Sequence, residues 1–271
     1  MKRAKTLLIS LLLLSIATSC TNHQSRQQEP EHQTQIIAHR GFWRVEGSYE
    51  NSISALQNAQ RERFFGSELD VHITRDGVLV VNHDDDFRGI DINTHTYEEL
   101  QVVRLPNGET IPTLRRHLEL AAEHPYTRLI IEIKYKDDEE IENRTVAATL
   151  RLVEEMNMQH QVEYISFSRN ICREIKRLAP DATVVFLSNR DATVLTPQEL
   201  EKMGFSGFSY HFNLIRRNPH WVAEAQELGL TTNVWTVNDE DIMREMLALG
   251  VDFITTSNPL KLREIIESGD F

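Results

Sequence analysis

The stretch Glu-Leu-Asp-Val-His-Ile at residues 68–73 decides the fold, because charged and aliphatic side chains alternate along it. Successive side chains of a β-strand point to opposite faces, so Glu68 and Asp70 share one face and the aliphatic residues share the other. The aliphatic face suits packing under helices, which leaves the charged face pointing into the lumen of a barrel. A strand with its polar face in solvent is the alternative, but a strand of a parallel barrel has no face in solvent.

Charged residues also end three other apolar runs in the first half of the chain. His39 and Arg40 end the first run, and His83 ends another. Glu132 and Lys134 end a further run and, being two positions apart, point to the same side. Ionised groups are rare inside strands unless they are paired or bind a metal. Because the ends of parallel barrel strands meet at one mouth, we expect a single site there for a hard metal ion and an anionic ligand.

Strand and helix candidates alternate along most of the chain. We predict strands at residues 35–39, 67–73, 78–83, 128–134, 162–168, 183–188, 205–210, 231–237 and 251–256. We predict helices at residues 51–63, 112–123, 138–156, 169–178, 197–203, 219–228, 239–249 and 259–267. This repetition predicts an α/β protein whose parallel strands close into a TIM (β/α)8 barrel.

One connection does not fit a parallel crossover. Only Thr74-Arg75-Asp76-Gly77 joins the second and third strand candidates, whereas a parallel crossover needs about a dozen residues or more. The Asp-Gly turn therefore predicts a hairpin. Residues 84–111, after the third strand candidate, show little apolar periodicity, and we expect them to form a short insertion over the mouth of the barrel.

The N-terminal part of the chain differs from the rest. Residues 1–19 combine a basic start with an apolar run too short to span a bilayer comfortably, which predicts a signal peptide. Small residues precede Cys20, as in a bacterial lipoprotein signal, where the cysteine is lipidated; plain secretion is the alternative. Residues 20–34 are predicted to be a flexible tether, and 35–271 the barrel. We expect an exported, lipid-anchored protein of the bacterial cell envelope, in the periplasm or facing the surface.

Charge and cysteine content limit the partners of the chain. The formal net charge of −12 argues against nucleic acid and anionic membrane faces, so we expect contact with a membrane only through the lipid anchor. The second cysteine, Cys172, would have no partner once Cys20 is acylated, and a buried structural thiol is expected there. The sequence does not specify the oligomeric state.

The candidate ligands favour a hard cation. Glu68, Asp70 and Glu132 would supply oxygen ligands, and carboxylates without a cysteine cluster or paired histidines favour Mg²⁺ or Ca²⁺ over Zn²⁺, with no choice between the two. His39 and His83 could accept and donate protons, as cleavage of a phosphodiester by an internal hydroxyl requires. Single histidines of this kind are often core residues, but two beside carboxylates favour a site.

Ordered motifs connect these residues to a known family. They are Ala38-His39-Arg40-Gly41, Glu50-Asn51, Glu68-Leu69-Asp70-Val71, Thr74-Arg75-Asp76-Gly77, Val80-Val81-Asn82-His83-Asp84, Pro112-Thr113-Leu114, Glu132-Ile133-Lys134 and Asn233-Val234-Trp235-Thr236-Val237-Asn238. In order and spacing the set resembles the glycerophosphodiester phosphodiesterase family over about residues 35–260.

The resemblance implies a TIM barrel that binds a divalent cation and the roles of eight residues. The implied roles are metal ligands for Glu68, Asp70 and Glu132, an acid/base pair for His39 and His83, phosphate contacts for Arg40 and Lys134, and a pocket-lining aromatic for Trp235. The implied reaction hydrolyses a glycerophosphodiester to glycerol 3-phosphate and an alcohol, through attack by the glycerol 2-hydroxyl and a cyclic glycerol phosphate. Neither the released alcohol nor the separate roles of the two histidines follow from the sequence.

Three other functions remain as alternatives. They are a phosphodiesterase directed at lysophospholipids or phosphoinositides, a non-catalytic lipoprotein that binds a phosphate ligand, and a metal-dependent sugar isomerase. The last strand departs from the family pattern, because Thr255-Thr256-Ser257-Asn258-Pro259 lacks an aspartate that the family commonly carries. We expect Asn51 to cap a helix, His117 to lie in solvent, and His72 to lie either at the pocket rim or in solvent.

Overall fold

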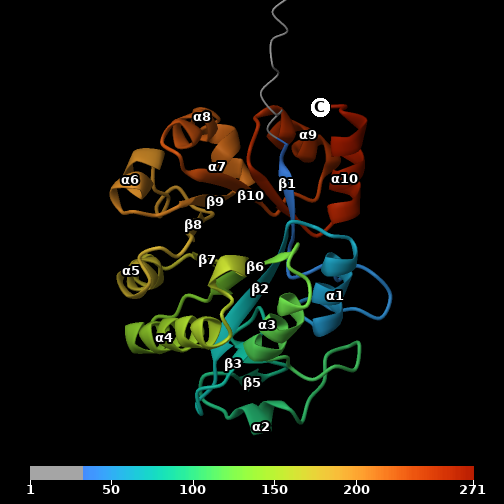
Figure 1. The fold of residues 1–271 in the computed structure, drawn as a ribbon, viewed down its shortest axis with the longest axis vertical. Helices are drawn as coiled ribbons and strands as arrows, with labels where there is room; N and C mark the ends of the chain where they lie inside the picture. Colours follow the sequence, from blue (N-terminus) through green and yellow to red (C-terminus); the bar gives the residue numbers. More distant parts are fainter. Residues whose placement is uncertain (1–32) are drawn as a thin grey trace, which may run out of the picture. The chain divides into compact units, whose positions relative to one another are not determined.

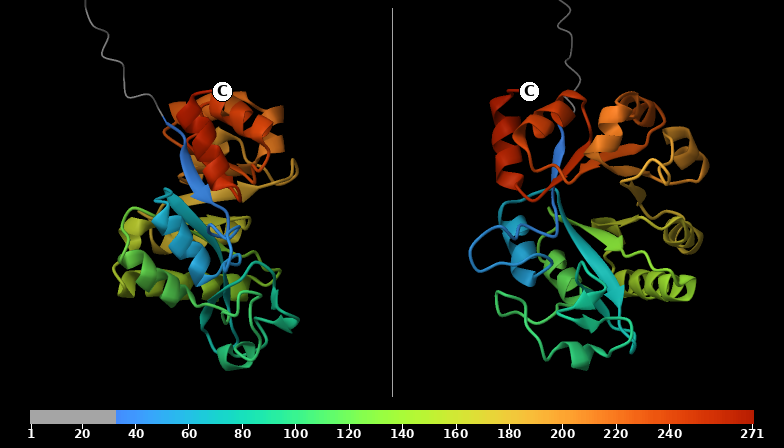
Figure 2. Two further views of the ribbon diagram at one scale, coloured as in Figure 1. Left: turned by 90° about the vertical axis from the view of Figure 1, so that its right-hand side faces the viewer. Right: turned by 180° about the vertical axis from the view of Figure 1, so that it is seen from behind.

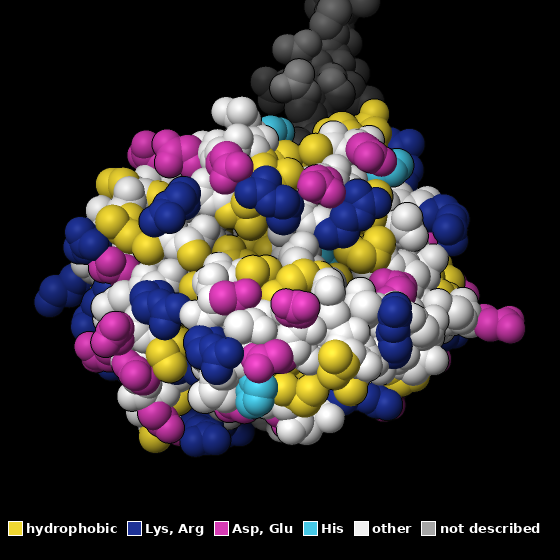
Figure 3. All heavy atoms as spheres, turned by 90° about the horizontal axis from the view of Figure 1, so that it is seen from below, with side chains coloured by type: hydrophobic (Ala, Val, Ile, Leu, Met, Phe, Trp, Pro, Cys, Tyr) yellow, Lys and Arg dark blue, Asp and Glu magenta, His cyan; other side chains and the backbone are white. Residues whose placement is uncertain are grey.

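The computed structural model describes residues 33–271. The predicted signal peptide, Cys20 and most of the predicted tether lie outside the described residues. Within the described part of the chain, no helix is both long and apolar enough to cross a membrane. Figure 3 shows one face of the molecule, on which Lys and Arg side chains are interspersed with Asp and Glu side chains. Charge on this face is therefore mixed in sign rather than gathered into one basic area.

Within residues 33–271, parallel strands close into the predicted TIM barrel (Figures 1 and 2). In ring order the strands are β1 (Gln35–Ala38), β2 (Gly66–Ile73), β6 (Arg128–Ile133), β7 (Val162–Ser166), β8 (Val184–Ser188), β9 (Gly207–His211), β10 (Thr231–Trp235) and β11 (Phe253–Thr256). The barrel closes because β1 pairs with β11 on one side and with β2 on the other. All strand candidates are confirmed to within two residues at each end.

Helices alternate with the barrel strands and cover the outside of the sheet (Figure 1). They are α1 (Ile53–Arg61), α3 (Leu114–Ala122), α4 (Glu139–Glu155), α5 (Arg169–Leu178), α6 (Pro197–Lys202), α7 (Phe212–Arg217), α8 (His220–Glu227), α9 (Glu240–Ala248) and α10 (Pro259–Ser268), with a 3-10 turn at Gln159–Gln161. The sequence missed α7. This helix starts directly after β9, so no loop residues separate the two elements.

The predicted hairpin is confirmed, and the residues after it form the predicted insertion. Strand β3 (Leu79–Val81) runs antiparallel to the end of β2. Residues after β3 form β4 (Asp86–Phe87), β5 (Ile90–Asp91) and the short helix α2 (Tyr97–Leu100). These elements enclose a separate apolar cluster that includes Phe87, Ile92 and Leu100. They lie at the bottom of Figure 1, away from α8 and α9.

The alternation on β2 produces the expected two-sided burial. Leu69 and Val71 belong to the apolar cluster packed under the helices. Glu68 and Asp70 are 4% and 1% exposed, so the alternative of a polar strand face in solvent is wrong. A separate cluster of buried aliphatic residues comes from the neighbouring barrel strands: Ile37, Ile130, Ile165, Val185 and Leu187. The barrel therefore buries carboxylates beside apolar side chains.

A close backbone contact holds the turn after β1. Gly41 adopts φ +78°, in the left-handed region, and the neighbouring Phe42 N–H donates a hydrogen bond of 3.0 Å to the Ala55 carbonyl. A Cβ atom at Gly41 would lie 2.7 Å from Ala55 Cβ and 2.9 Å from the Ala55 carbonyl carbon. The turn that carries His39 and Arg40 is thus packed tightly against α1.

Replacing Gly41 by alanine should destabilise the protein more than replacing Gly47 by alanine. Both glycines have a positive φ, at +78° and +76°, so both variants carry the same backbone strain. Nothing lies within 4 Å of a Cβ at Gly47, whereas Gly41 would overlap Ala55. The additional loss in the free energy of unfolding should be about 1–3 kcal/mol, measured by urea denaturation. Equal losses in the two variants would contradict the close contact.

Candidate active site

A pocket of about 290 Å³ opens at the carboxyl ends of the barrel strands. All eight pocket residues that the sequence predicts line it: His39, Arg40, Glu68, Asp70, His83, Glu132, Lys134 and Trp235. No residue of the 84–111 segment is among the residues that line this pocket, although Asp84 contacts His83, which does line it. The insertion encloses its own apolar cluster.

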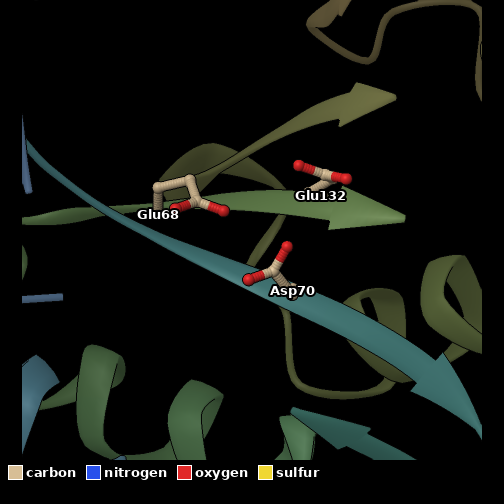
Figure 4. Close-up of side chains that lie close together, drawn as sticks. All are labelled: Glu68, Asp70 and Glu132. Carbon is tan, nitrogen blue, oxygen red and sulfur yellow. The ribbon is translucent and has the colours of Figure 1, made fainter. Parts of the chain in front are cut away.

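Three carboxylates meet inside the pocket (Figure 4). Glu68 and Asp70 come from β2, and Glu132 comes from β6, where it pairs in register with Asp70. One oxygen from each lies within 4.8 Å of the other two, and all three residues are buried. Oxygen ligands at this spacing, on two rigid neighbouring strands, fit a hard divalent cation. The geometry of this chain therefore agrees with the predicted metal ligands.

Burial and mutual repulsion set the charge state of this acidic trio (Glu68, Asp70 and Glu132). Burial, and then the charges of Asp70 and Glu132, raise the pKa of Glu68 well above its usual value. Burial also raises the pKa of Glu132. Burial opposes ionisation of Asp70 too, but the positive charge of Lys134 and further favourable interactions lower its pKa to about 2. Full ionisation of the trio is therefore disfavoured, and a bound cation would favour it.

Two cations border the acidic trio. The Lys134 ammonium lies 2.9 Å from Asp70 Oδ1 and 2.9 Å from Glu132 Oε1. Burial disfavours its charge, but these two carboxylates outweigh burial and raise the pKa of Lys134. The Arg40 backbone N–H donates a 2.7 Å hydrogen bond to Glu68, and its guanidinium donates one of 2.8 Å to Glu50. Both side chains therefore carry positive charge at the pocket wall.

The two histidines differ in environment. Burial, and then the charge of Arg40, lower the pKa of His39 from 6.5 to about 3, so its imidazole is neutral at neutral pH. Its Nδ1 lies 3.1 Å from the Ser257 hydroxyl. The His83 side chain is 38% exposed, and its Nδ1 lies 2.7 Å from an Asp84 carboxylate oxygen. The two rings therefore differ in burial and in hydrogen-bond partner.

An apolar wall faces the charged residues. Ile165, Phe167, Leu187 and Trp235 form it, contributed by β7, β8, β10 and the loop after β7. The Trp235 indole N–H donates a 2.8 Å hydrogen bond to the Ser209 carbonyl, and its ring meets Phe167 edge to face at 5.5 Å. The pocket therefore has one ionic side and one apolar side.

Several residues near the pocket behave differently from the expectations. Ser52, not Asn51, caps helix α1, because its side chain accepts the Ala55 N–H. His117 is 2% exposed and His72 is 1% exposed, so neither lies in solvent. The His72 ring nitrogen Nε2 lies 3.4 Å from the carbonyl oxygen of His83, a pocket residue.

Sequence analysis did not predict several residues of the last strands that line the pocket or contact His39. Thr255 and Ser209 line the pocket, and both hydroxyls accept hydrogen bonds from Asn233 Nδ2. Ser257 contacts His39. The last strand therefore contributes hydroxyl groups where the family pattern often has an aspartate. The motif around Asn233 was recognised in the sequence. Serine and threonine are so common that the sequence alone did not identify their hydroxyl groups as part of the pocket.

Comparisons with known proteins agree with the fold and the motifs. A curated glycerophosphodiester phosphodiesterase from Caldanaerobacter subterraneus subsp. tengcongensis is 28% identical, over 87% of this chain and 99% of the relative. A solved glycerophosphodiester phosphodiesterase from Parabacteroides distasonis is 41% identical with a TM-score of 0.85, covering 89% of this chain and 100% of that one.

A more distant structure shares the fold alone. It is an Oleispira antarctica phosphodiesterase, described in complex with the product sn-glycerol-3-phosphate, at 23% identity and a TM-score of 0.76. It covers 87% of this chain and 97% of its own. The model of the glycerophosphoryl diester phosphodiesterase family matches residues 39–261, which include every predicted pocket residue. This chain therefore belongs to the glycerophosphoryl diester phosphodiesterase family.

Proposed function

We propose that the protein is a metal-dependent glycerophosphodiester phosphodiesterase, which hydrolyses its substrate to glycerol 3-phosphate and an alcohol. One observation carries the proposal: three buried carboxylates, two histidines and two cations line a single pocket. Curated relatives across most of the chain bear the name of this activity. The Oleispira antarctica protein, which has the same fold, is described with the product that the reaction would release.

The acidic trio would hold the cation. Glu68, Asp70 and Glu132 offer only oxygen ligands, which favours Mg²⁺ or Ca²⁺. A bound divalent cation would stabilise negative charge on the phosphoryl oxygens and lower the pKa of a coordinated hydroxyl. Arg40 and Lys134 border the trio and would attract the phosphodiester anion.

The two histidines would transfer the protons. His39, neutral at neutral pH, would accept the proton of the glycerol 2-hydroxyl as its oxygen attacks phosphorus. His83, held by Asp84, would donate a proton to the departing alcohol oxygen as the phosphorus–oxygen bond breaks. The cyclic glycerol phosphate would then be opened by water, with the two histidines exchanging roles. Trp235 and the apolar wall would contact the carbon atoms of the substrate.

We also propose that the protein is exported and attached to the cell envelope of a bacterium by a lipid on Cys20. The basic start, the apolar run and the small residues before this cysteine support the proposal. The anchor would keep the enzyme at a membrane surface, where deacylated phospholipids are released. Residues 20–34 would act as the tether of the catalytic domain.

Replacing His39 or His83 by alanine should lower turnover by about 10²–10⁴-fold, because each change removes a proton-transfer group. The assay measures glycerol 3-phosphate from glycerophosphocholine, glycerophosphoethanolamine and glycerophosphoinositol, with and without a chelator. The exposed His160, changed to alanine, is the matched control and should keep full activity.

Three outcomes would contradict the proposal in different ways. Full activity in either histidine variant would remove that residue from the mechanism. Turnover of lysophosphatidylcholine alone would replace the substrate class by lysophospholipids. Binding of a phosphodiester without any product would favour a non-catalytic binding protein.

Divalent cations should stabilise the protein more at about pH 8 than at about pH 5. The raised pKa values of Glu68 and Glu132 mean that the folded chain keeps their protons longer than the unfolded chain. Without metal, stability therefore falls as pH rises through about 4.5 and toward those raised values. Asp70, with its pKa lowered to about 2, has the opposite effect only under acidic conditions. Thermal unfolding with and without Mg²⁺ or Ca²⁺ measures the shift.

The variant Glu68→Gln distinguishes the effect of carboxylate repulsion on the melting temperature from the effect of metal binding. Removing one carboxylate charge should raise the metal-free melting temperature at about pH 8 and should reduce the shift that the cation produces. A cation shift of equal size at both pH values, or an unchanged shift in this variant, would contradict the proposed ligand set.

Replacing Cys20 by serine should abolish labelling by a fatty-acid analogue in a bacterial host and release the protein from the membrane fraction. Cys172 changed to serine is the matched control, because this thiol is fully buried and should not affect labelling. Wild-type protein without label, or a labelled Cys20 variant, would contradict the lipid anchor.

A further inference from the structure

Asn51 lies directly behind one of the proposed metal ligands. Its side-chain amide donates a 2.8 Å hydrogen bond from Nδ2 to Asp70 Oδ2, and its Oδ1 accepts a 3.2 Å bond from the Asp70 backbone N–H. The amide orientation is fixed, because a backbone N–H can only donate and an ionised carboxylate can only accept. Asn51 is 4% exposed, so water does not compete strongly for these bonds. One side chain thus holds both the backbone and the carboxylate of Asp70.

We propose that Asn51 is a positioning residue that fixes the orientation of Asp70 for the divalent cation. The inference rests on the proposed function, because it assumes that the acidic trio binds a metal. A carboxylate that is free to rotate would have to lose that freedom when the cation binds. A carboxylate that is already held offers its remaining lone pairs to the pocket at a lower entropic cost.

The backbone around Asn51 shows that this position is built for the contact. Asn51 adopts φ +60°, in the left-handed region that asparagine tolerates better than most residues. Its backbone N–H donates a 2.9 Å bond to the Arg40 carbonyl. The Arg40 backbone N–H in turn donates to Glu68. The segment after β1 therefore fixes two members of the trio, Glu68 through Arg40 and Asp70 through Asn51.

The neutral charge of Asn51 distinguishes it from Lys134 and Arg40, which are the charged partners of Asp70. Lys134 contacts the second oxygen of Asp70 and also contacts Glu132, so its positive charge repels an incoming cation. In the proposed mechanism, Lys134 also attracts the phosphodiester. Asn51 holds Asp70 without adding charge, so its bond to Asp70 Oδ2 is compatible with a bound cation. It can therefore hold the ligand both before and after the metal binds.

Calorimetric titration of the folded protein with Mg²⁺ and with Ca²⁺ tests this role without measuring activity. Asn51→Gly removes the amide while keeping a residue that accepts a positive φ. Asn157→Gly is the matched control, because Asn157 also has a positive φ, of +55°, and is exposed. We expect the dissociation constant of the cation to rise about tenfold or more in Asn51→Gly and to stay unchanged in Asn157→Gly.

The titration distinguishes failure of the positioning role of Asn51 from failure of the proposed metal site. An unchanged dissociation constant in folded Asn51→Gly would overturn the positioning role and leave the proposed function intact. Absence of cation binding by the wild-type protein would instead overturn the proposed metal site. Where Asn51→Gly fails to give a cooperative unfolding transition, Asn51→Ser and Asn157→Ser replace the pair, with the same expected tenfold difference.

Discussion

Mutual repulsion among three buried carboxylates is the constraint on which the rest of the site depends. Glu68, Asp70 and Glu132 are at most 8% exposed, and no stable fold would bury them together without compensating groups. The surrounding groups provide part of the compensation: Lys134 between two carboxylates, the Arg40 N–H on Glu68, and Asn51 on Asp70. The remaining repulsion would favour binding of a divalent cation at this point.

The barrel strands hold these carboxylates in fixed positions. Asp70 and Glu132 pair in register on adjacent strands, so their side chains are placed by the sheet and not by mobile loops. The histidines, by contrast, come from the turns after β1 and β3, where they can reach toward the cation site from two sides. This division places the three carboxylates on rigid strands, and it would place the proposed proton transfer at the mouth of the barrel.

The order and spacing of the motifs were enough to predict the barrel and the eight pocket residues, and the alternation of charged and aliphatic residues on β2 placed Glu68 and Asp70 on the lumen side. Other features depend on tertiary contacts. Asn51 and Ser52 both suit a helix cap, and only the position of Asp70 shows that Asn51 contacts this carboxylate. His72 and His117 are both buried, which the local sequence pattern did not indicate. Helix α7 follows β9 without a loop, so periodicity gave no boundary.

The central claim is that this trio holds a divalent cation within reach of both histidines. Anomalous diffraction from crystals grown with Mn²⁺ and glycerol 3-phosphate tests it most directly, since Mn²⁺ replaces Mg²⁺ at oxygen-rich sites. The account predicts a single strong peak about 2.0–2.6 Å from oxygens of Glu68, Asp70 and Glu132, with the phosphate beside it. A peak bound by other residues, or phosphate bound with no metal at the trio, would contradict it.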